Sequence, residues 1–378
     1  MDNLTHSLFG LTLGRTSMGR AGSGTTLTLL LASNAPDIDI VTTAGGALSY
    51  LEWHRGPTHG PLGVLALGVV AASIAWCGTR LWRAASTDRS AEPPADPPAS
   101  FPALWAVATV GVMCHILMDL PTSYGTRPLS PFDWRWFAHD WMPIVDIYLL
   151  IALAAGLLIG RRSMAAGRRL AALALLFMAL NYGVRATAHH QAVAHGPRLF
   201  GPLLPERCDD AAERSRGWID RWPLHRDALA APVPDDERER SAKRCLAEIA
   251  AIPDFVSPFR WRVIADLSNA YEMRTINLLA LPDPSEADWR LAVRHPNQWT
   301  PAVAAAAQTR VGTVFLGFSR FPSVRSVVGG SGDATVVWND IRFAIGRVTD
   351  SRRERPNFFT ATVRLDRDGG VVEEKLGP

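Results

Sequence analysis

Long apolar runs in the first half of the chain constrain its fold more than any other feature. An α-helix needs about 20 mainly apolar residues to cross the hydrocarbon core of a bilayer. Four runs have about this length and contain only isolated polar residues: 61–82, 101–120, 143–160 and 169–188. These runs predict a polytopic α-helical membrane domain in which the chain crosses the bilayer four times.

Two shorter apolar runs precede the long ones, at residues 4–18 and 24–35, and glycines separate them. They predict a tight helical hairpin that either enters the bilayer or crosses it. The N-terminus lacks the basic region and the small-residue cleavage site of a secretory signal. We therefore expect this apolar start to remain part of the folded protein.

The second half of the chain has the composition of a water-soluble domain, although hydrophobic residues make up 48% of the whole sequence. Helices are expected at about 206–221 and 236–251. Segments rich in β-branched and aromatic residues predict antiparallel strands at 259–266, 271–280, 311–318, 333–345 and 358–366.

The predicted fold class is therefore mainly α. A helical membrane domain at residues 1–190 is followed by an α+β domain at residues 191–378 that is rich in antiparallel strands. The formal net charge of +3 is small for 378 residues and does not indicate a nucleic-acid partner. The bilayer itself is the expected partner.

Arginine-rich loops orient the membrane domain, because loops rich in Arg and Lys stay in the cytoplasm. The loop at 161–169 (RRSMAAGRR) contains four arginines. The segment after the first long run carries Arg80, Arg83 and Arg89. Both loops fall on the same side if all four runs cross. We therefore expect residues 36–60, 121–142 and everything after about 189 to lie outside the cytoplasm.

Histidines and aspartates recur at the predicted outer end of these apolar segments. The set comprises His6, Asp37, Asp39, His54, His59, His115, Asp119 and Asp146. Ionisable groups beside hydrocarbon are costly unless they pair or bind a cation, which makes a functional site the default interpretation. Oxygen and nitrogen ligands without thiolates suit zinc, manganese or iron. The set predicts a divalent metal centre, with zinc the expected ion.

Local spacing supports a metal. His115 and Asp119 are four residues apart, so on a helix they share one face and can reach a common ion. The Gly56-Pro57 turn allows His54 and His59 to converge. A metal-bound hydroxide would supply a nucleophile at neutral pH. The guanidinium of Arg55 has the fork shape that suits a phosphate or carboxylate group.

Four sequence motifs together resemble the YdjM/YfhP-type bacterial membrane-bound metal-dependent hydrolases. They are MDNLTHSLFG, N-A-P-D-I-D, H-R-G-P-T-H and H-I-L-M-D-L-P-T-S-Y-G, all within residues 1–150. The later R-F-P (320–322) and W-N-D-I-R-F (338–343) resemble the carboxy-terminal part of longer members. The resemblance implies a multi-pass protein of the bacterial inner membrane, with the site and the C-terminal domain on the extracytoplasmic side.

Such proteins are distantly similar to zinc-dependent phospholipases C and three-zinc single-strand nucleases. In those enzymes an aspartate, a later histidine and an H-x-x-x-D helix hold metals, and Asp39, His54 and His115/Asp119 reproduce that order. The second H…H-x-x-x-E/D set of the soluble enzymes is missing from this sequence. His139, Asp140 and Asp146 are the nearby candidates for a third ion.

The expected activity is metal-assisted hydrolysis, of phosphoesters such as lipid head groups according to the resemblance. Arg55 would bind the anionic group of the substrate, and Asp37 joins it in the expected catalytic set. The alternative is a non-catalytic envelope protein whose metal is structural, with a closed ligand shell. An intramembrane metalloprotease is disfavoured because H-E-x-x-H does not occur.

Several of these residues have plainer interpretations. His115 and Asp119 could form a polar contact between helices, and Asp37 and Asp39 could make only Asx turns. The histidines after the last run are expected at the membrane interface rather than as ligands: His189, His190 and His195. An aromatic belt or the lining of a lipid entrance is expected for Trp134, Trp136 and Trp141.

Cysteine usage leaves one question open. Cys77 and Cys114 lie inside predicted crossings, whereas Cys208 and Cys245 fall in the predicted external part. An extracytoplasmic compartment permits a disulfide between the latter two without requiring one.

Overall fold

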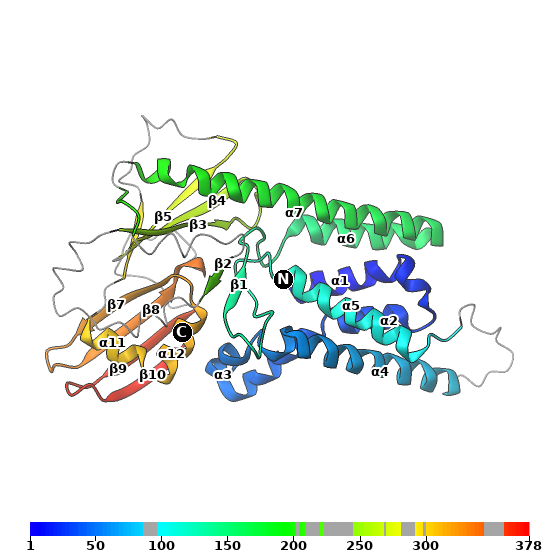
Figure 1. Ribbon diagram of the computed structural model, residues 1–378, viewed down its shortest axis with the longest axis horizontal. Helices are drawn as coiled ribbons and strands as arrows, with labels where there is room; N and C mark the ends of the chain where they lie inside the picture. The colour runs from blue at the N-terminus through cyan, green and yellow to red at the C-terminus, as the bar shows by residue number, and fades with distance from the viewer. Residues whose placement is uncertain are drawn as a thin grey trace. The chain divides into compact units, whose positions relative to one another are not determined.

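The computed structural model of the chain is shown in Figure 1. It describes residues 1–85, 97–201, 204–208, 220–222, 245–267, 270–280, 292–297, 300–343 and 359–377. The chain forms two compact units. The first is made of Met1–Val41 and Trp53–Arg185, and the second of Thr42–Glu52 and Ala186–Pro378.

The first unit is built from helices. They are α1 (Asn3–Gly14), α2 (Thr25–Ala32), α4 (Pro61–Ala85), α5 (Phe101–Asp119), α6 (Ile147–Ile159) and the first part of α7 (Met164–Phe200). Short 3-10 helices lie between them: η1 (Ser17–Ala21), η3 (Pro57–His59) and η4 (Gly160–Arg162). The short strand β1 (Trp136–Ala138) lies in the connection from α5 to α6. Residues of the 3-10 helix η2 (Ala35–Gly45) and of α3 (Gly46–Trp53) occur in both units.

Within the described residues, three helices are long and apolar enough to cross a membrane: α4, α5 and α7. They coincide with three of the four predicted crossings. Helix α6 has only 13 residues, about 20 Å at 1.5 Å per residue, which is shorter than a hydrocarbon core of about 30 Å. It begins later than the predicted run because the carboxylate of Asp146 caps it, accepting hydrogen bonds from the N–H groups of Tyr148 and Leu149.

The expected helical hairpin is formed by α1 and α2. They approach closely at Gly10, where a Cβ atom would lie 2.8 Å from the carbonyl oxygen of Leu29. Helix α5 packs on α2 in the same way, because a Cβ on Gly111 would lie 2.8 Å from the Cβ of Ala32. Small residues at such crossings are typical of membrane helices. The close packing of α1, α2 and α5 brings side chains from separate parts of the chain together at one end of the unit.

The second unit contains two antiparallel four-stranded sheets. The first has the order β3-β4-β5-β6, with β3 (Leu246–Pro253), β4 (Arg260–Leu267), β5 (Ala270–Asn277) and β6 (Val293–Pro296). The second has the order β10-β9-β8-β7, with β7 (Pro322–Val328), β8 (Ala334–Asp340), β9 (Thr360–Leu365) and β10 (Val371–Leu376). Helices α11 (Pro301–Ala307) and α12 (Arg310–Phe318) pack on the second sheet. Trp338 of β8 lies fully buried in this sheet, opposite Val324 of β7 and Ala361 of β9.

The strands expected at 259–266, 271–280, 333–345 and 358–366 correspond to β4, β5, β8 and β9. Of the 333–345 segment, 344 and 345 lie outside the described residues, and Ile341–Phe343 form a 3-10 turn instead of continuing the strand.

The strand expected at 311–318 is wrong, because these residues belong to helix α12. Thr309 caps that helix by accepting a hydrogen bond from the N–H of Gly312. Val311, Phe315 and Phe318 then fall at helical spacing and are buried. This spacing is that of an amphipathic helix, which the β-branched composition of the segment concealed.

The helix expected at 236–251 is wrong where the structure describes it, because residues 246–251 belong to β3. Pairing with β4, for example Ile249 opposite Ala265, outweighs the helix propensity of the alanines and glutamate in this segment. Residues 236–244 lie outside the described part. A helix was also expected at 206–221, and most of these residues lie outside the described part. Its last two residues belong to the short strand β2 (Asp220–Trp222). Cys208 and Cys245 form a disulfide.

Candidate metal centre

Four side chains meet at the end of the first unit where α4 begins and α5 ends. Asp37, His59, His115 and Asp119 each offer one ligand atom, and these atoms all lie within 4.8 Å of one another. Four oxygen and nitrogen donors at this separation fit a single divalent cation. We refer to these four residues as the inner cluster.

The local fold explains how these residues meet. Asp37 lies in η2, directly after the α1–α2 hairpin, and His59 ends η3, just before α4. His115 and Asp119 lie one turn apart near the C-terminal end of α5, as their spacing predicted. The side chains of His59, His115 and Asp119 are fully buried, whereas that of Asp37 is 14% exposed. The inner cluster therefore has one accessible side.

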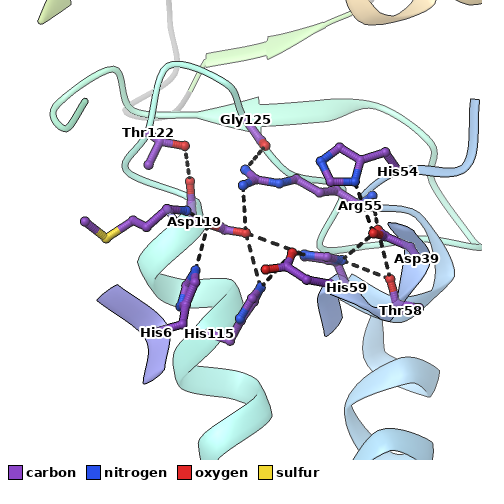
Figure 2. A network of polar contacts seen from close by, with 12 residues as sticks. His6, Asp39, His54, Arg55, Thr58, His59, His115, Asp119, Thr122 and Gly125 are labelled. Atoms are coloured by element: carbon purple, nitrogen blue, oxygen red, sulfur yellow. Dashed lines mark hydrogen bonds and ion pairs between the residues drawn. The ribbon is translucent and has the colours of Figure 1, made fainter. Parts of the chain in front are cut away.

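Asp119 is the centre of this arrangement, as Figure 2 shows. Its Oδ2 atom lies 3.4 Å from Nε2 of His115 and 3.5 Å from Nε2 of His59. Arg55 approaches the same oxygen to 3.1 Å. The other oxygen of Asp119 lies 3.4 Å from Nε2 of His6, and the amino group of Met1 also contacts it.

The contacts of the two histidines of the cluster favour a proton on Nδ1 of each ring. Nδ1 of His115 lies 2.7 Å from the carbonyl oxygen of Ser33, to which it can only donate. Nδ1 of His59 lies 3.0 Å from the hydroxyl of Thr58. With the proton on Nδ1, each Nε2 presents a lone pair. Among the described residues neither Nε2 atom has a hydrogen-bond partner, and Oδ2 of Asp119 has only the ion pair with Arg55 beside the two histidines.

Buried polar atoms without partners are costly. Here, the Nε2 atoms of His59 and His115 face the carboxylate oxygens of Asp37 and Asp119 at 3.4 to 3.9 Å. A cation between them would satisfy all of these atoms together. The inner cluster therefore fits a metal by its donor set and by its unpaired atoms.

A second group of residues surrounds His59. Oδ1 of Asp39 lies 3.1 Å from Nδ1 of His54, and its Oδ2 accepts a hydrogen bond of 2.7 Å from the backbone N–H of Arg55. The same oxygen lies 3.4 Å from the hydroxyl of Thr58, which in turn contacts His59. Asp39 thus orients His59 through Thr58, in the way that carboxylates beside ligating histidines commonly do.

Arg55 lies between the two groups. Its φ angle of 53° is in the left-handed region, which is uncommon for a residue with a Cβ. The hydrogen bond from its N–H to Asp39 holds this turn, and its side chain donates to the carbonyl of Gly125 at 2.6 Å. The guanidinium also lies 4.8 Å from the ring centre of Tyr124. Strained backbone held by several contacts is typical of functional sites.

The pKa values of His59, His54 and Asp37 suit metal ligation. Burial, together with the nearby His115 and Arg55, holds the pKa of His59 well below its usual range. Burial also lowers the pKa of His54, although Asp39 opposes this effect. Burial alone would raise the pKa of Asp37, but His115 and Arg55 beside it lower that pKa to about 2. Neutral imidazoles and an ionised carboxylate are the forms that bind metals.

His6 of α1 stacks on His115, with ring centres 3.8 Å apart. Neither of its ring nitrogens has a hydrogen-bond partner. It therefore belongs to the same layer as the inner cluster, although it is not one of the four residues whose ligand atoms converge.

Asp146 lies apart from this centre. It caps α6 and pairs with Arg185 of α7 at 2.8 Å, both side chains being fully buried. The residues weighed for a third ion are likewise outside the inner cluster: Asp140 has a φ of 57° and His139 stacks on Trp141 at 4.3 Å. The sequence grouped Asp146 with the ligands because it lies at the same end of its segment, and the complementary charge of Arg185 was overlooked.

Of the tryptophans expected in a membrane belt, Trp136 is fully buried. It packs on Tyr124 and lies beneath the guanidinium of Arg127, 4.3 Å from its ring centre. Trp134 is partly exposed and contacts Trp53 edge to face. An aromatic belt therefore does not describe Trp136, whose role is to support the loop that carries Tyr124 and Gly125.

Sequence reasoning missed Ser33, Thr58, Tyr124 and Gly125, which hold the ligands and Arg55. Thr58 and the Tyr-Gly pair do lie inside the motifs H-R-G-P-T-H and D-L-P-T-S-Y-G. Their position next to candidate ligands was the available signal, but backbone carbonyl acceptors such as that of Ser33 leave no signature in a sequence.

Comparisons with known proteins match the part of the chain that carries the inner cluster. An uncharacterized protein, YfhP, from Bacillus subtilis (strain 168) is 28% identical over 167 residues, which are 42% of this chain and 46% of YfhP. The alignment thus spans about half the length of that relative. No solved structure matches the chain. The YdjM inner membrane protein family matches residues 1–192, half of the chain and every residue of the inner cluster. The chain therefore belongs to the YdjM inner membrane protein family.

Proposed function

We propose that this protein is a metal-dependent hydrolase of the bacterial inner membrane. Asp37, His59, His115 and Asp119 would hold one divalent ion, and zinc is the ion we expect for two imidazoles and two carboxylates in a four-donor set. The observation that carries the proposal is the pair of bare, buried Nε2 atoms that face Asp119. An ion held there would lower the pKa of a bound water towards neutrality.

The residues around the inner cluster suit the remaining tasks of hydrolysis. Asp37 is the one ligand with an exposed edge, so its ionised carboxylate can accept a hydrogen bond from water on the open side. Arg55 brings a positive charge to the same centre and would bind an anionic substrate group. Asp39 and Thr58 hold His59 in the orientation that ligation requires.

A phosphoester with an apolar portion, such as a lipid head group, is the substrate class that we propose. Apolar side chains are exposed on the segment that carries the aspartates and on the loop beyond α5: Ile38, Ile40, Val41, Leu129 and Phe132. Such residues suit a surface at the depth of the lipid head groups. The distant similarity to phospholipases C points in the same direction.

We also propose that the centre and the second unit lie on the extracytoplasmic side. Arg83, at the end of α4, and Arg161, in η4, lie at the ends of helices remote from the inner cluster, where the positive-inside rule places cytoplasmic loops. The disulfide between Cys208 and Cys245 supports the same assignment, because disulfides persist mainly in oxidising compartments.

A non-catalytic envelope protein with a structural metal is the second candidate. The complete burial of His59, His115 and Asp119 favours it, since structural ions have closed shells. The two functions differ in whether the ion keeps a position open to water.

The test uses the purified full chain in detergent. Chelation followed by addition of zinc, manganese or magnesium should abolish and then restore hydrolysis of a phosphodiester panel that includes phosphatidylglycerol and a soluble aryl phosphodiester. A protein that binds one equivalent of metal but hydrolyses none of the panel, with no exchangeable metal-bound water, would support the structural role. A protein that binds no metal would overturn both.

A further inference from the structure

A cavity of about 810 Å³ lies at the opposite end of the first unit from the inner cluster. Five segments line it: the end of α1, η1, the start of α2, the turn at η4 and the start of α7. Arg15, Arg20, Arg161 and Arg168 are all among the lining residues, together with the hydroxyl-bearing Thr16, Thr26 and Ser163. None of the described residues that line it is acidic. We refer to it as the arginine cavity.

The charge of this cavity is not balanced by the residues that the structure describes. Arg15 donates a hydrogen bond of 2.7 Å to the carbonyl of Leu157, at the end of α6. Arg20, Arg161 and Arg168 are exposed, and within the described part of the chain they form no ion pair. Three guanidinium groups from separate segments therefore point at one cavity with their charge uncompensated.

The backbone adds to the positive potential. Helix α7 begins at Met164, which lines the cavity, and Ser163 caps it by accepting a hydrogen bond from the N–H of Ala166. The N-terminus of a helix carries a partial positive charge. Gly160 and Gly167 let η4 and α7 approach closely, since a Cβ on Gly160 would lie 3.0 Å from the Cα of Gly167. This packing fixes Arg161 and Arg168 around the same space.

We propose that the arginine cavity binds a phosphate-ester anion, supplied by the head group of an anionic phospholipid. Guanidinium groups match phosphate oxygens in pairs, and basic pockets between membrane helices are suited to such head groups. Large apolar side chains are exposed next to the cavity, at Leu158, Ile159 and Met164. They offer a surface for acyl chains, which a free phosphate would not need. The site is separate from the inner cluster and does not depend on the proposed hydrolysis.

Residues 161–169 provide a matched pair of variants for the test. Arg161 and Arg168 line the cavity, whereas their neighbours Arg162 and Arg169, which are also exposed, do not line it. Each pair has one arginine in η4 and one in α7. The double variant Arg161→Ala/Arg168→Ala and the double variant Arg162→Ala/Arg169→Ala therefore remove the same charge from the same two elements. Arg20→Ala, in η1, changes the cavity from a different segment.

The delipidated full chain in detergent would be titrated with phosphatidylglycerol, phosphatidylethanolamine or inorganic phosphate, and bound ligand counted by native mass spectrometry. We expect wild type to bind phosphatidylglycerol in preference to phosphatidylethanolamine. The Arg161/Arg168 double variant should weaken this binding about tenfold or more, because each lost guanidinium removes charge-assisted hydrogen bonds to the phosphate. The Arg162/Arg169 double variant should change it less than about twofold, and Arg20→Ala should weaken it in the same direction as the cavity double variant.

Equal weakening by both double variants would overturn the proposal, because diffuse loop charge would then explain binding. Equal affinity for the two lipids would also overturn it. Binding of inorganic phosphate that displaces phosphatidylglycerol would overturn the assignment to a lipid. Metal content and the unfolding midpoint should stay at the wild-type values in each variant whose weaker binding is used as support. If a double variant fails to fold, Arg20→Ala still tests the proposal.

Discussion

Asp119 connects three helical segments through one buried carboxylate. Its oxygens lie within 3.5 Å of nitrogens from His6, His59, His115 and Arg55. Because burial disfavours a carboxylate that lacks sufficient countercharge, the side chain is stabilised either by a bound ion or by Arg55 and the amino group of Met1 without an ion. The two explanations differ in whether the loss of Asp119 or of His115 lowers the metal content of the protein.

We expect Asp119→Ala and His115→Ala each to lower bound metal from one equivalent to a small fraction of one. Removal of one of a few ligands leaves an open, weakly held ion. The unfolding midpoint should fall as well, because metal binding stabilises the fold. Metal content would be measured on the purified full chain by plasma mass spectrometry, with thermal unfolding recorded in parallel.

His190→Ala is the matched control, since His190 is an exposed histidine of α7 outside the inner cluster. It should change neither metal content nor unfolding. If the Asp119 and His115 variants retain the metal content of wild type, these two residues form only an interhelical contact, and the hydrolase proposal loses its physical basis.

At the scale of residues, the sequence predicted the ligand types but not how each would be used. His115 and Asp119 could be paired from helical spacing alone. Asp37 could be grouped with them through its position at the predicted outer face, although it lies far away in the chain. Asp146 could not be separated from the ligands, because its partner Arg185 follows it by 39 residues along the chain, a contact that only tertiary structure makes.

At the scale of elements, the contact between α2 and α5 determines where His115 lies. A Cβ on Gly111 would lie 2.8 Å from the Cβ of Ala32. Gly111 precedes His115 by one turn on the same helix face. Separation of the two helices at this point would therefore move a ligand of the inner cluster.

We expect Gly111→Ala to lower stability by about 1–3 kcal/mol, the usual effect of overpacking a close contact, and to weaken metal binding. Thermal unfolding in detergent and metal titration measure the two effects. Gly78→Ala, in α4, is the control, because a Cβ there meets no atom within 4 Å. An unchanged unfolding midpoint for both variants would show that the packing of α5 on α2 does not depend on this contact.

The elements themselves were predictable to different degrees. Apolar length identified α4, α5 and α7, since a long apolar run has few alternatives to a membrane helix. Short amphipathic segments were harder to assign. Residues 311–318 contain β-branched and aromatic residues but form α12 through the Thr309 cap, and residues 246–251 form β3 because β4 pairs with them. Local composition competes there with capping and with long-range pairing.

At the scale of the whole molecule, helix α7 continues from the first unit into the second, as η2 and α3 also contribute residues to both. It runs from Met164 to Phe200, and the division between the units falls after Arg185. The expected domain boundary at residue 190 stays a prediction. The orientation in the membrane can be tested at two positions, one beside the arginine cavity and one within the second unit.

We expect Ser163→Cys to be protected from a membrane-impermeant thiol reagent in intact cells and to react after permeabilisation, whereas Ser331→Cys should react in both conditions. Both serines are exposed. Cys77 and Cys114 are the free cysteines of the described residues and would be replaced by alanine, while Cys208 and Cys245 are already joined. Ser163 lies in the loop with four arginines, which the positive-inside rule places in the cytoplasm. The reverse labelling pattern would move the inner cluster to the cytoplasmic face, where a disulfide is not expected to persist and where the proposed substrate would have to be a cytoplasmic phosphoester.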